Sequence, residues 1–151
     1  MPFYIETEIK ESNILNAGIG RFLLEDCKKD TVIRKQKINS QELFKFTDES
    51  NFSIIDLDVL RHYAHTSPKD NLEDNSIYLN DPPLYTNHSD NPNVYFIFNE
   101  DFKYTLSKFD LKKGDELYQN YNDFKKIEWF ENFLNNKNIK SLRQFGEELK
   151  R

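Results

Sequence analysis

The chain has 151 residues, a formal net charge of −5 and a hydrophobic content of 37%. This length predicts one domain that can bury a sizeable core. The negative charge argues against general nucleic-acid binding, whose affinity comes mostly from Lys and Arg on phosphates, and it favours basic partners.

The sequence does not predict a membrane-spanning, secreted or zinc-binding protein. No apolar run reaches the roughly 18 residues of a transmembrane helix, and the N-terminus lacks the basic and apolar regions of a signal peptide. The single cysteine, Cys27, cannot form an internal disulfide, and no cysteine cluster predicts a zinc site. We therefore expect a reducing, cytoplasmic location, or the interior of a host cell if the protein is viral. The oligomeric state is left open.

The first third of the chain is expected to be β-structure. Its composition predicts strands over residues 3–9, 22–24 and 31–35. Gly18 and Gly20 lie before the second strand, where a glycine hairpin is the default interpretation, because glycine tolerates positive φ and close backbone approach. A dinucleotide-binding loop is excluded, since G-x-G-x-x-G would require glycine at position 23, which is leucine.

The middle of the chain is predicted to alternate between short helices and strands. These elements are a helix over 40–46, a strand over 52–55, helical turns over 59–65 and a strand over 77–79. Ser40 would cap the first helix, and Pro68 would stop the helical turns.

His62 and His65 are three residues apart on the predicted helical turns and could chelate a metal. No acidic or cysteine partner lies at a recognisable spacing, so one solvent-facing and one packed histidine is the better interpretation. No metal site is predicted.

Residues 84–93 form a ten-residue polar stretch with no helical or alternating period, and they lead into an apolar strand over 94–98. A plain turn needs about two to five residues. This longer stretch, with His88 in its middle, therefore indicates a functional site and not a simple connection. Residues 102–106 alternate apolar and polar side chains, so they are expected to pair back as a hairpin strand.

The C-terminal part is predicted to contain a glycine turn and two helices. Gly114 would adopt the left-handed conformation in the turn, an amphipathic helix would span 124–135, and a Ser141-x-x-Gln144 capping box would open the last helix. The side chains expected to face inward are Ile127, Phe130 and Leu134 of the first helix and Leu142, Phe145 and Leu149 of the second, with Trp129 and Phe133 in the core.

Three motifs, in this order and spacing, resemble those of SET-domain protein-lysine methyltransferases. The segment Gly18-x-Gly20-x-Phe22 resembles Gly-x-Gly-x-Phe, Asn87-His88-Ser89-x-x-Pro92-Asn93 matches an Asn-His-Ser-x-x-Pro-Asn motif, and Gly114-Asp115-Glu116-Leu117 with Tyr121 resembles Gly-Glu-Glu-Leu-x-x-x-Tyr. Asp115 replaces the usual first Glu. Three of the four glycines of the chain fall inside these motifs.

The resemblance implies a mainly β fold with short helices, the β-clip fold of SET domains. The segment that ends at Tyr121 would pass beneath the loop before it in a pseudoknot-like threading. Residues 1–123 would form the SET domain, and residues 124–151 would be a helical extension packed on it. The cysteine-rich zinc segment that often follows the domain is missing, so the helices are expected to cover the cofactor or the substrate channel instead.

The resemblance also implies an activity, the transfer of a methyl group from S-adenosylmethionine to a lysine nitrogen of a protein substrate. Tyr121 would be the catalytic residue that orients the amine. Asn87 would reach the amino end of the cofactor, the backbone of His88 would meet the adenine, and Phe124 would stack on it. The full set of implied cofactor contacts is Gly18, Ile19, Gly20, Arg21, Asn87, His88, Tyr121 and Phe124.

The implied substrate channel contains Tyr85, Phe96, Gln119 and Tyr63. The family usually has Arg-Phe where this chain has Leu84-Tyr85, and Gln119 stands where an aromatic residue is common and is linked to how many methyl groups are added. Phe96 could fill that space from the neighbouring strand. Two alternatives remain open, an inactive SET-like module that binds cofactor or partners, and an unrelated β protein with a histidine site.

Overall fold

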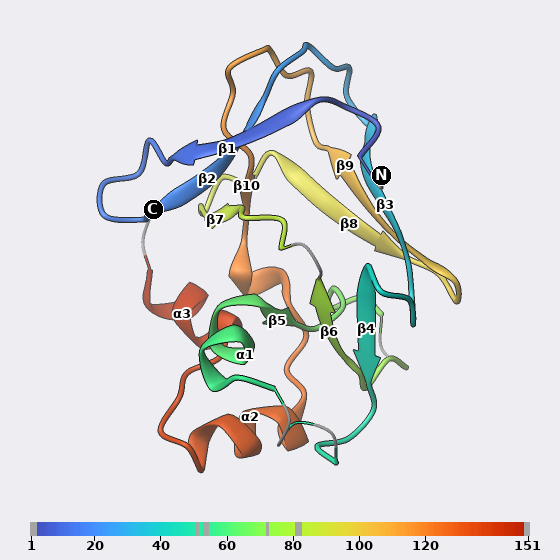
Figure 1. Ribbon diagram of the computed structural model, residues 1–151, viewed down its shortest axis with the longest axis vertical. Helices are drawn as coiled ribbons and strands as arrows, with labels where there is room; N and C mark the ends of the chain where they lie inside the picture. The colour runs from blue at the N-terminus through green and yellow to red at the C-terminus, as the bar shows by residue number, and fades with distance from the viewer. Residues whose placement is uncertain (1–2, 51, 53–54, 72, 81–82, 150–151) are drawn as a thin grey trace. The chain divides into compact units, whose positions relative to one another are not determined.

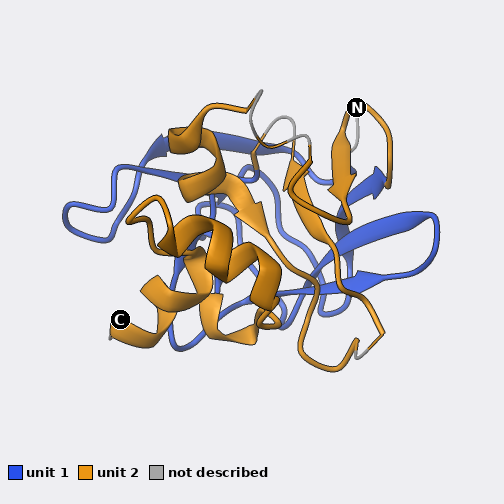
Figure 2. Cartoon of the chain, turned by 90° about the horizontal axis from the view of Figure 1, so that it is seen from below, with its two compact units in different colours: residues 1–37, 84–120, 151 blue, residues 38–83, 121–150 orange. Residues whose placement is uncertain are grey.

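The computed structural model describes residues 3–50, 52, 55–71, 73–80 and 83–149. The chain forms two compact units, coloured separately in Figure 2. Unit 1 comprises residues 1–37, 84–120 and 151, and unit 2 comprises 38–83 and 121–150. The predicted division into residues 1–123 and 124–151 stays a prediction.

Unit 1 is built from short β-sheets (Figure 1). Its strands are β1 (Thr7–Glu11), β2 (Ile19–Leu23), β3 (Val32–Lys37), β7 (Asn87–His88), β8 (Val94–Phe98), β9 (Phe102–Ser107) and β10 (Tyr118–Gln119). β1 and β2 form an antiparallel hairpin, β3, β9 and β8 form a three-stranded antiparallel sheet, and β7 pairs in parallel with β10. The predicted β8–β9 hairpin is confirmed.

The core of unit 1 contains the buried side chains of Leu23, Cys27, Ile33, Val94, Leu111 and Leu117. They come from β2, the segment between β2 and β3, β3, β8 and the segment between β9 and β10, so burial of this cluster holds separate sheets together. Phe3, in the first predicted strand, forms only a single bridge to Arg34, and regular pairing begins at β1.

Unit 2 combines one small sheet with helices. Its elements are β4 (Leu43–Phe46), α1 (Leu57–Tyr63), β5 (Ala64–His65), β6 (Ile77–Asn80), η2 (Tyr121–Asp123), α2 (Glu128–Asn135) and α3 (Leu142–Glu148). The sheet order is β4-β6-β5, with both pairings antiparallel. The core brings together Phe52, Leu60, Ala64, Ile77, Leu79, Ile127, Phe130 and Leu134.

The predicted inward face of α2 is confirmed, because Ile127, Phe130 and Leu134 are at most 2% exposed. The helix itself begins at Glu128, not at residue 124. The predicted capping box of α3 is also confirmed, since the Ser141 hydroxyl accepts from the Gln144 N–H and the Gln144 side chain accepts from the Ser141 N–H.

The inward face predicted for α3 is wrong in detail. Leu142, Phe145 and Leu149 are only half-buried, and the buried position of this helix is Gly146. A Cβ atom at Gly146 would lie 2.7 Å from the Cβ of Tyr121, so a side chain here would push the helix away from η2.

The helix predicted over 40–46 is wrong. Residues 43–46 form β4, and Leu43 is fully buried while Phe44 is 40% exposed, the alternation of a strand. Ser40 does accept a hydrogen bond from the Glu42 N–H (3.1 Å), but this is a local turn. Pairing with β6 outweighs the weak local helix preference.

Two further middle-chain predictions need comment. The strand predicted over 52–55 includes residues 53 and 54, which lie outside the described residues, and Phe52 lies in a tight turn. The helical turns over 59–65 are confirmed as α1, which ends earlier, at Tyr63, and is followed by β5. In the described part of the chain, no helix is both long and apolar enough to cross a bilayer.

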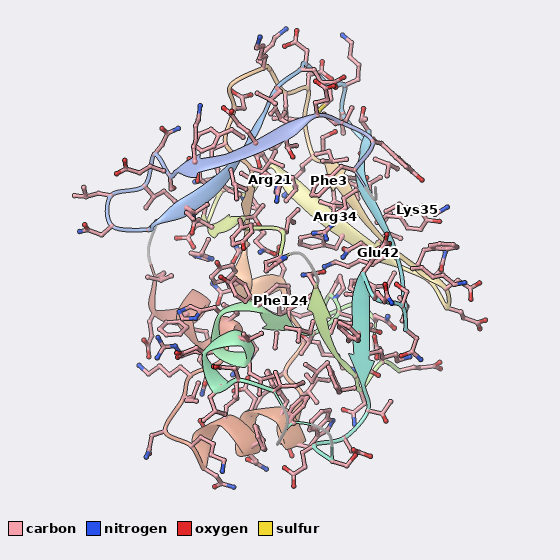
Figure 3. All side chains as sticks on the ribbon, in the orientation of Figure 1. Phe3, Arg21, Arg34, Lys35, Glu42 and Phe124 are labelled. Carbon is pink, nitrogen blue, oxygen red and sulfur yellow. The ribbon has the colours of Figure 1, made fainter. Side chains whose placement is uncertain are left out.

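Two buried basic side chains lie on neighbouring strands of unit 1. Arg34 of β3 is fully buried and Lys103 of β9 is 3% exposed. The Lys103 ammonium nitrogen lies 4.8 Å from the ring centre of Phe96, and the Arg34 guanidinium lies 4.8 Å from that of Phe3. Figure 3 shows Phe3 beside Arg34 and Arg21. Burial, reinforced by repulsion from Arg34, holds the pKa of Lys103 well below its usual value.

We predict that Phe130→Ala lowers the free energy of unfolding by about 3–5 kcal/mol, because it opens a cavity in the core that α2 shares with the sheet of unit 2. Urea denaturation would measure the change. The control is Phe109→Ala, whose side chain is 53% exposed, and which should change stability by less than about 0.5 kcal/mol. Equal, small effects for both variants would contradict the shared core.

We also predict that Lys103 makes stability rise with pH in the alkaline range. Between its lowered folded pKa and the ordinary value near 10.5, the unfolded chain holds a proton that the folded chain lacks, so raising the pH favours folding. Comparing the pH dependence of unfolding with that of Lys103→Met isolates this contribution, since the tyrosines titrate in both proteins. A wild-type curve parallel to that of Lys103→Met would contradict the prediction.

Candidate functional site

Residues from all three motifs meet in unit 1. The side-chain amide nitrogen Nδ2 of Asn87 donates to the Ile19 carbonyl (3.0 Å) and lies 3.4 Å from Oε2 of Glu116. These residues are 68 and 29 positions from Asn87 along the chain. Asn87 therefore joins the Gly18–Gly20 segment to the segment that enters β10.

Residues 87–93, in the polar stretch before β8, bond to β10 and to the residue pair just before it. In the parallel pair, Asn87 lies opposite Tyr118 and His88 opposite Gln119. The Ser89 N–H donates to the Gln119 carbonyl (2.9 Å). The Asn93 side chain donates to the Glu116 carbonyl and accepts from the Tyr118 N–H, both at 2.8 Å. These bonds fit the threading expected of the fold.

The two glycines of the first motif have different physical roles. Gly18 has a φ of +78°, which favours glycine, and a Cβ there would meet open space. Gly20 lies in β2, and a Cβ there would lie 2.3 Å from Oε2 of Glu116. The hairpin interpretation therefore applies to Gly18. Position 20 instead has no room for a side chain, because the Glu116 carboxylate occupies the space beside it.

Glu116 lies inside the third motif, but the sequence analysis did not predict it as a site residue. Its side chain is buried, and it accepts hydrogen bonds from the Ser12 hydroxyl (2.6 Å), the Asn13 N–H (2.8 Å) and the Tyr118 hydroxyl (3.1 Å). Burial, together with the bond to Glu116, raises the pKa of the Tyr118 phenol. The sequence signal for it was its position inside the Gly114-Asp115-Glu116-Leu117 motif.

His88 is fully buried, and its Nε2 lies 2.9 Å from Oδ1 of Asp90. The carboxylate of Asp90, two residues away, orients the ring. A fully enclosed ring fits the prediction that His88 contributes through its backbone and is not an acid or base.

Tyr121, the last residue of the third motif, lies in η2 of unit 2. Its ring stacks on that of Phe124, with centres 6.2 Å apart and an angle of 12° between planes. Phe124 is 4% exposed and also lies 5.7 Å from the His65 ring. Tyr63, at the end of α1, is half-buried against the unit 2 core.

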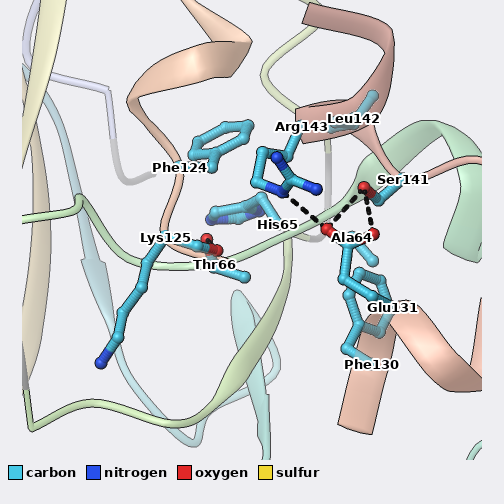
Figure 4. Close-up of a pocket in the computed structure, with 10 residues that line it drawn as sticks. All are labelled: Ala64, His65, Thr66, Phe124, Lys125, Phe130, Glu131, Ser141, Leu142 and Arg143. Carbon is cyan, nitrogen blue, oxygen red and sulfur yellow. Dashed lines mark hydrogen bonds and ion pairs between the residues drawn. The ribbon is translucent and has the colours of Figure 1, made fainter. Parts of the chain in front are cut away.

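A small hollow of unit 2 contains Phe124, His65 and a polar network (Figure 4). The buried Glu131 carboxylate accepts from Arg143 Nε (2.7 Å) and from the Ser141 hydroxyl (3.2 Å). This network joins α2 to the start of α3. The stacking of Phe124 on adenine stays a prediction. In the described structure the Phe124 ring contacts the rings of Tyr121 and His65.

The two histidines considered for metal binding are separated by their surroundings. The His62 ring is exposed and lies 2.8 Å from the Asp58 carbonyl oxygen, whereas His65 is buried. Among the described residues, no group of three His, Cys, Asp or Glu side chains is placed to hold a metal ion.

Comparison with known families decides the relationship. Residues 18–122 match the SET domain family. The chain belongs to the SET-domain family. A search of curated proteins found no match.

Solved SET-domain structures share the fold at low identity. A chain of Polycomb Repressive Complex 2 from Chaetomium thermophilum, in an autoinhibited conformation bound to S-adenosylmethionine, is 19% identical, with a TM-score of 0.60 over 89% of this chain and 17% of that one. The apo complex with mutations in Ezh2 is 22% identical, with a TM-score of 0.59 over 82% of this chain and 16% of that one. This protein therefore spans about a sixth of the length of those chains.

A Plasmodium falciparum protein that carries the name of a histone methyltransferase is 22% identical, with a TM-score of 0.50 over 75% of this chain and 94% of that one. Identities this low establish the fold alone. The predicted fold class, mainly β with short helices in the SET arrangement, is confirmed.

Leu84 and Tyr85 stand directly before Thr86 and the second motif, where the resemblance led us to expect Arg-Phe. The buried Arg21 of β2 reaches this point, since its Nε donates to the Leu84 carbonyl (2.6 Å) and its Nη1 to the Thr7 hydroxyl (2.8 Å). Burial lowers the pKa of this guanidinium, with the Tyr85 phenol opposing the shift. Arg21 thus ties β2 to the chain that leads into Asn87.

The predicted channel residues of unit 1 have defined surroundings. Tyr85 has a φ of 57°, an uncommon left-handed conformation for a bulky residue. Gln119 donates to the Thr86 hydroxyl (2.7 Å), and the Phe96 ring faces Lys103. Together with Tyr63 of unit 2, they stay predictions for a substrate channel.

We predict that the space beside Gly20 is reserved for the Glu116 carboxylate. Gly20→Ala should lower the free energy of unfolding by about 1–3 kcal/mol through overpacking. In a Glu116→Ala background the same substitution should be neutral or should stabilise by about 0.5–1 kcal/mol, since alanine suits a strand better than glycine. A double-mutant cycle by denaturation measures the coupling, and additive effects would contradict the contact.

Proposed function

We propose that this SET-domain protein transfers a methyl group from S-adenosylmethionine to a lysine side-chain nitrogen of a protein substrate. The observation that carries the proposal is the meeting of Asn87, the Ile19 carbonyl and Glu116, which links all three motifs. β10, at the end of that meeting, leads within two residues to Tyr121. The Plasmodium falciparum neighbour that carries the name of a histone methyltransferase gives additional support.

The residues of unit 1 fit the amino end of such a cofactor. S-adenosylmethionine, when bound, supplies an electrophilic methyl group on a positively charged sulfur. The Asn87 oxygen Oδ1 accepts no hydrogen bond from the described residues, because only the amide nitrogen is engaged. It is therefore available to a ligand donor such as an ammonium group, and such charge-assisted hydrogen bonds are strong. The Asn87 amide is joined to the glycine segment through the Ile19 carbonyl, next to the exposed Gly18 in the chain.

Tyr121 is proposed to orient the lysine amine. The amine must be neutral to react, and lysine has an ordinary pKa near 10.4, so aromatic surroundings that disfavour the ammonium would help. A phenol with a pKa near 10 is a poor base at neutral pH, which leaves positioning as its contribution. The stacked Phe124 ring and the close packing of Gly146 hold Tyr121 in one orientation.

An inactive SET-like module that binds cofactor or a protein partner is the second candidate. Gln119 favours it, because its amide is bonded to Thr86 at the position where the family often has an aromatic residue. The retained Tyr121 favours the enzyme. In either case the proposed partner is a protein, and the cytoplasm or a host-cell interior is the proposed location.

We predict that Tyr121→Phe leaves folding and cofactor affinity nearly unchanged and lowers methyl transfer at least tenfold, about 1.4 kcal/mol of barrier. The substitution keeps the ring and its stacking on Phe124 but removes the oxygen that orients the amine. Calorimetry with S-adenosylmethionine and mass spectrometry of methylated protein should be run on one preparation.

The matched control is Asn87→Ala, which should instead weaken cofactor binding by about 1.5–3 kcal/mol, as expected for a lost hydrogen bond to a charged group. If Tyr121→Phe turned over as fast as the wild type, the proposed catalytic role of Tyr121 would be wrong. Cofactor binding by the wild type without any methyl transfer would favour the inactive module.

A further inference from the structure

Among the described residues, the buried Glu116 carboxylate accepts hydrogen bonds only from neutral donors. It is 3% exposed, and among the described residues it forms no ion pair with Lys, Arg or His. Burying a charge is costly unless hydrogen bonds compensate for lost water. Its donors come from the β1–β2 loop, β7 and β10, so the carboxylate is a junction inside unit 1.

The two oxygens of this carboxylate have different neighbours. Oε1 accepts from the Asn13 N–H (2.8 Å) and the Tyr118 hydroxyl (3.1 Å). Oε2 accepts from the Ser12 hydroxyl (2.6 Å) and lies 3.4 Å from Nδ2 of Asn87. Asn87 therefore faces two acceptors, Oε2 and the Ile19 carbonyl, with the same end of its amide.

A side-chain amide carries a donor group and an acceptor atom that can exchange places by rotation. With two acceptors on one side, only the orientation that directs NH₂ toward them avoids repulsion between oxygens. The other end of the amide, Oδ1, is then always the acceptor presented to a ligand.

We infer that Glu116 is a positioning residue that orients the Asn87 amide so that Oδ1 accepts the hydrogen bond of the ammonium group of S-adenosylmethionine. The orientation follows from the contacts within unit 1, whereas the identity of the ligand rests on the proposed function. Glu116 touches Asn87 and not the ligand, so its effect on binding is indirect.

Glu116→Gln tests this with almost no change of shape. The backbone N–H of Asn13 can only donate, so the new amide oxygen must stay at the position of Oε1, and the new NH₂ takes the position of Oε2. The Ser12 hydroxyl can accept from it, because a hydroxyl both donates and accepts. The NH₂ of Asn87 cannot, so the substitution sets two donors against each other at Asn87.

Ser12→Ala is the matched control. It removes the 2.6 Å bond to the same oxygen and also the bond from the Ile14 N–H to the Ser12 hydroxyl (3.1 Å). It should therefore destabilise the fold at least as much as Glu116→Gln, yet it leaves both acceptors of Asn87 in place. Should Glu116→Gln fail to fold, Glu116→Asp withdraws the carboxylate from Asn87 and takes its place in the comparison.

The experiment measures three quantities on each protein. These are unfolding in urea, calorimetric affinity for S-adenosylmethionine, and the NMR signals of the Asn87 side-chain NH₂ without ligand. We expect Glu116→Gln to weaken affinity at least tenfold and to shift the Asn87 signals. Ser12→Ala should keep the affinity within about twofold while losing stability.

Affinity losses that simply follow the stability losses would overturn the positioning role, as would Asn87 signals that do not move in Glu116→Gln. Should the wild type bind no S-adenosylmethionine while the Asn87 signals still move, the proposed function fails and the orienting role of Glu116 is supported. The failure of one is thus distinguishable from the failure of the other.

Discussion

The parallel pairing of β7 with β10 is the constraint on which the rest of unit 1 depends. It involves only two residues on each strand, too few to be stable without help. Side-chain and backbone bonds from Ser89 and Asn93 to the β10 segment extend it on both sides. Parallel strands require a long connection, and here the β8–β9 hairpin lies within it. The polar stretch before β8 thus holds the β10 segment, which leads to Tyr121, in place by hydrogen bonds; we call this stretch the clamp.

Polar groups stabilise this clamp from within. The carboxylate of Glu116 lies in the space left by Gly20, and neutral donors compensate for its burial. Arg21 is buried as well, with its guanidinium bonded to the Leu84 carbonyl. Such networks stabilise only when every member is satisfied, which makes the local geometry sensitive to single substitutions.

Unit 2 contributes differently, through an apolar core. The helices after residue 127 share that core with the small sheet and α1, since Phe130 packs with Phe52 and Leu60. They are structural parts of unit 2, whatever they contribute to catalysis. Tyr121 is held in the same unit by stacking on Phe124 and by the absence of a side chain at Gly146. A residue with a proposed positioning role therefore depends on the packing of α3.

The sequence by itself determined the motifs, the strands with clear alternation and the capped last helix, because these features arise from local spacing. It wrongly predicted a helix over 40–46, where residues 43–46 form β4, since Leu43 gains burial only when β6 is beside it. It also could not distinguish the turn glycine Gly18 from the space-making Gly20. Glu116 became significant only once tertiary structure brought Ser12 and Asn87 to its oxygens. Hydrogen bonds between residues 29 and 104 positions apart are invisible to local periodicity, so only the tertiary structure decided what surrounds the Glu116 carboxylate.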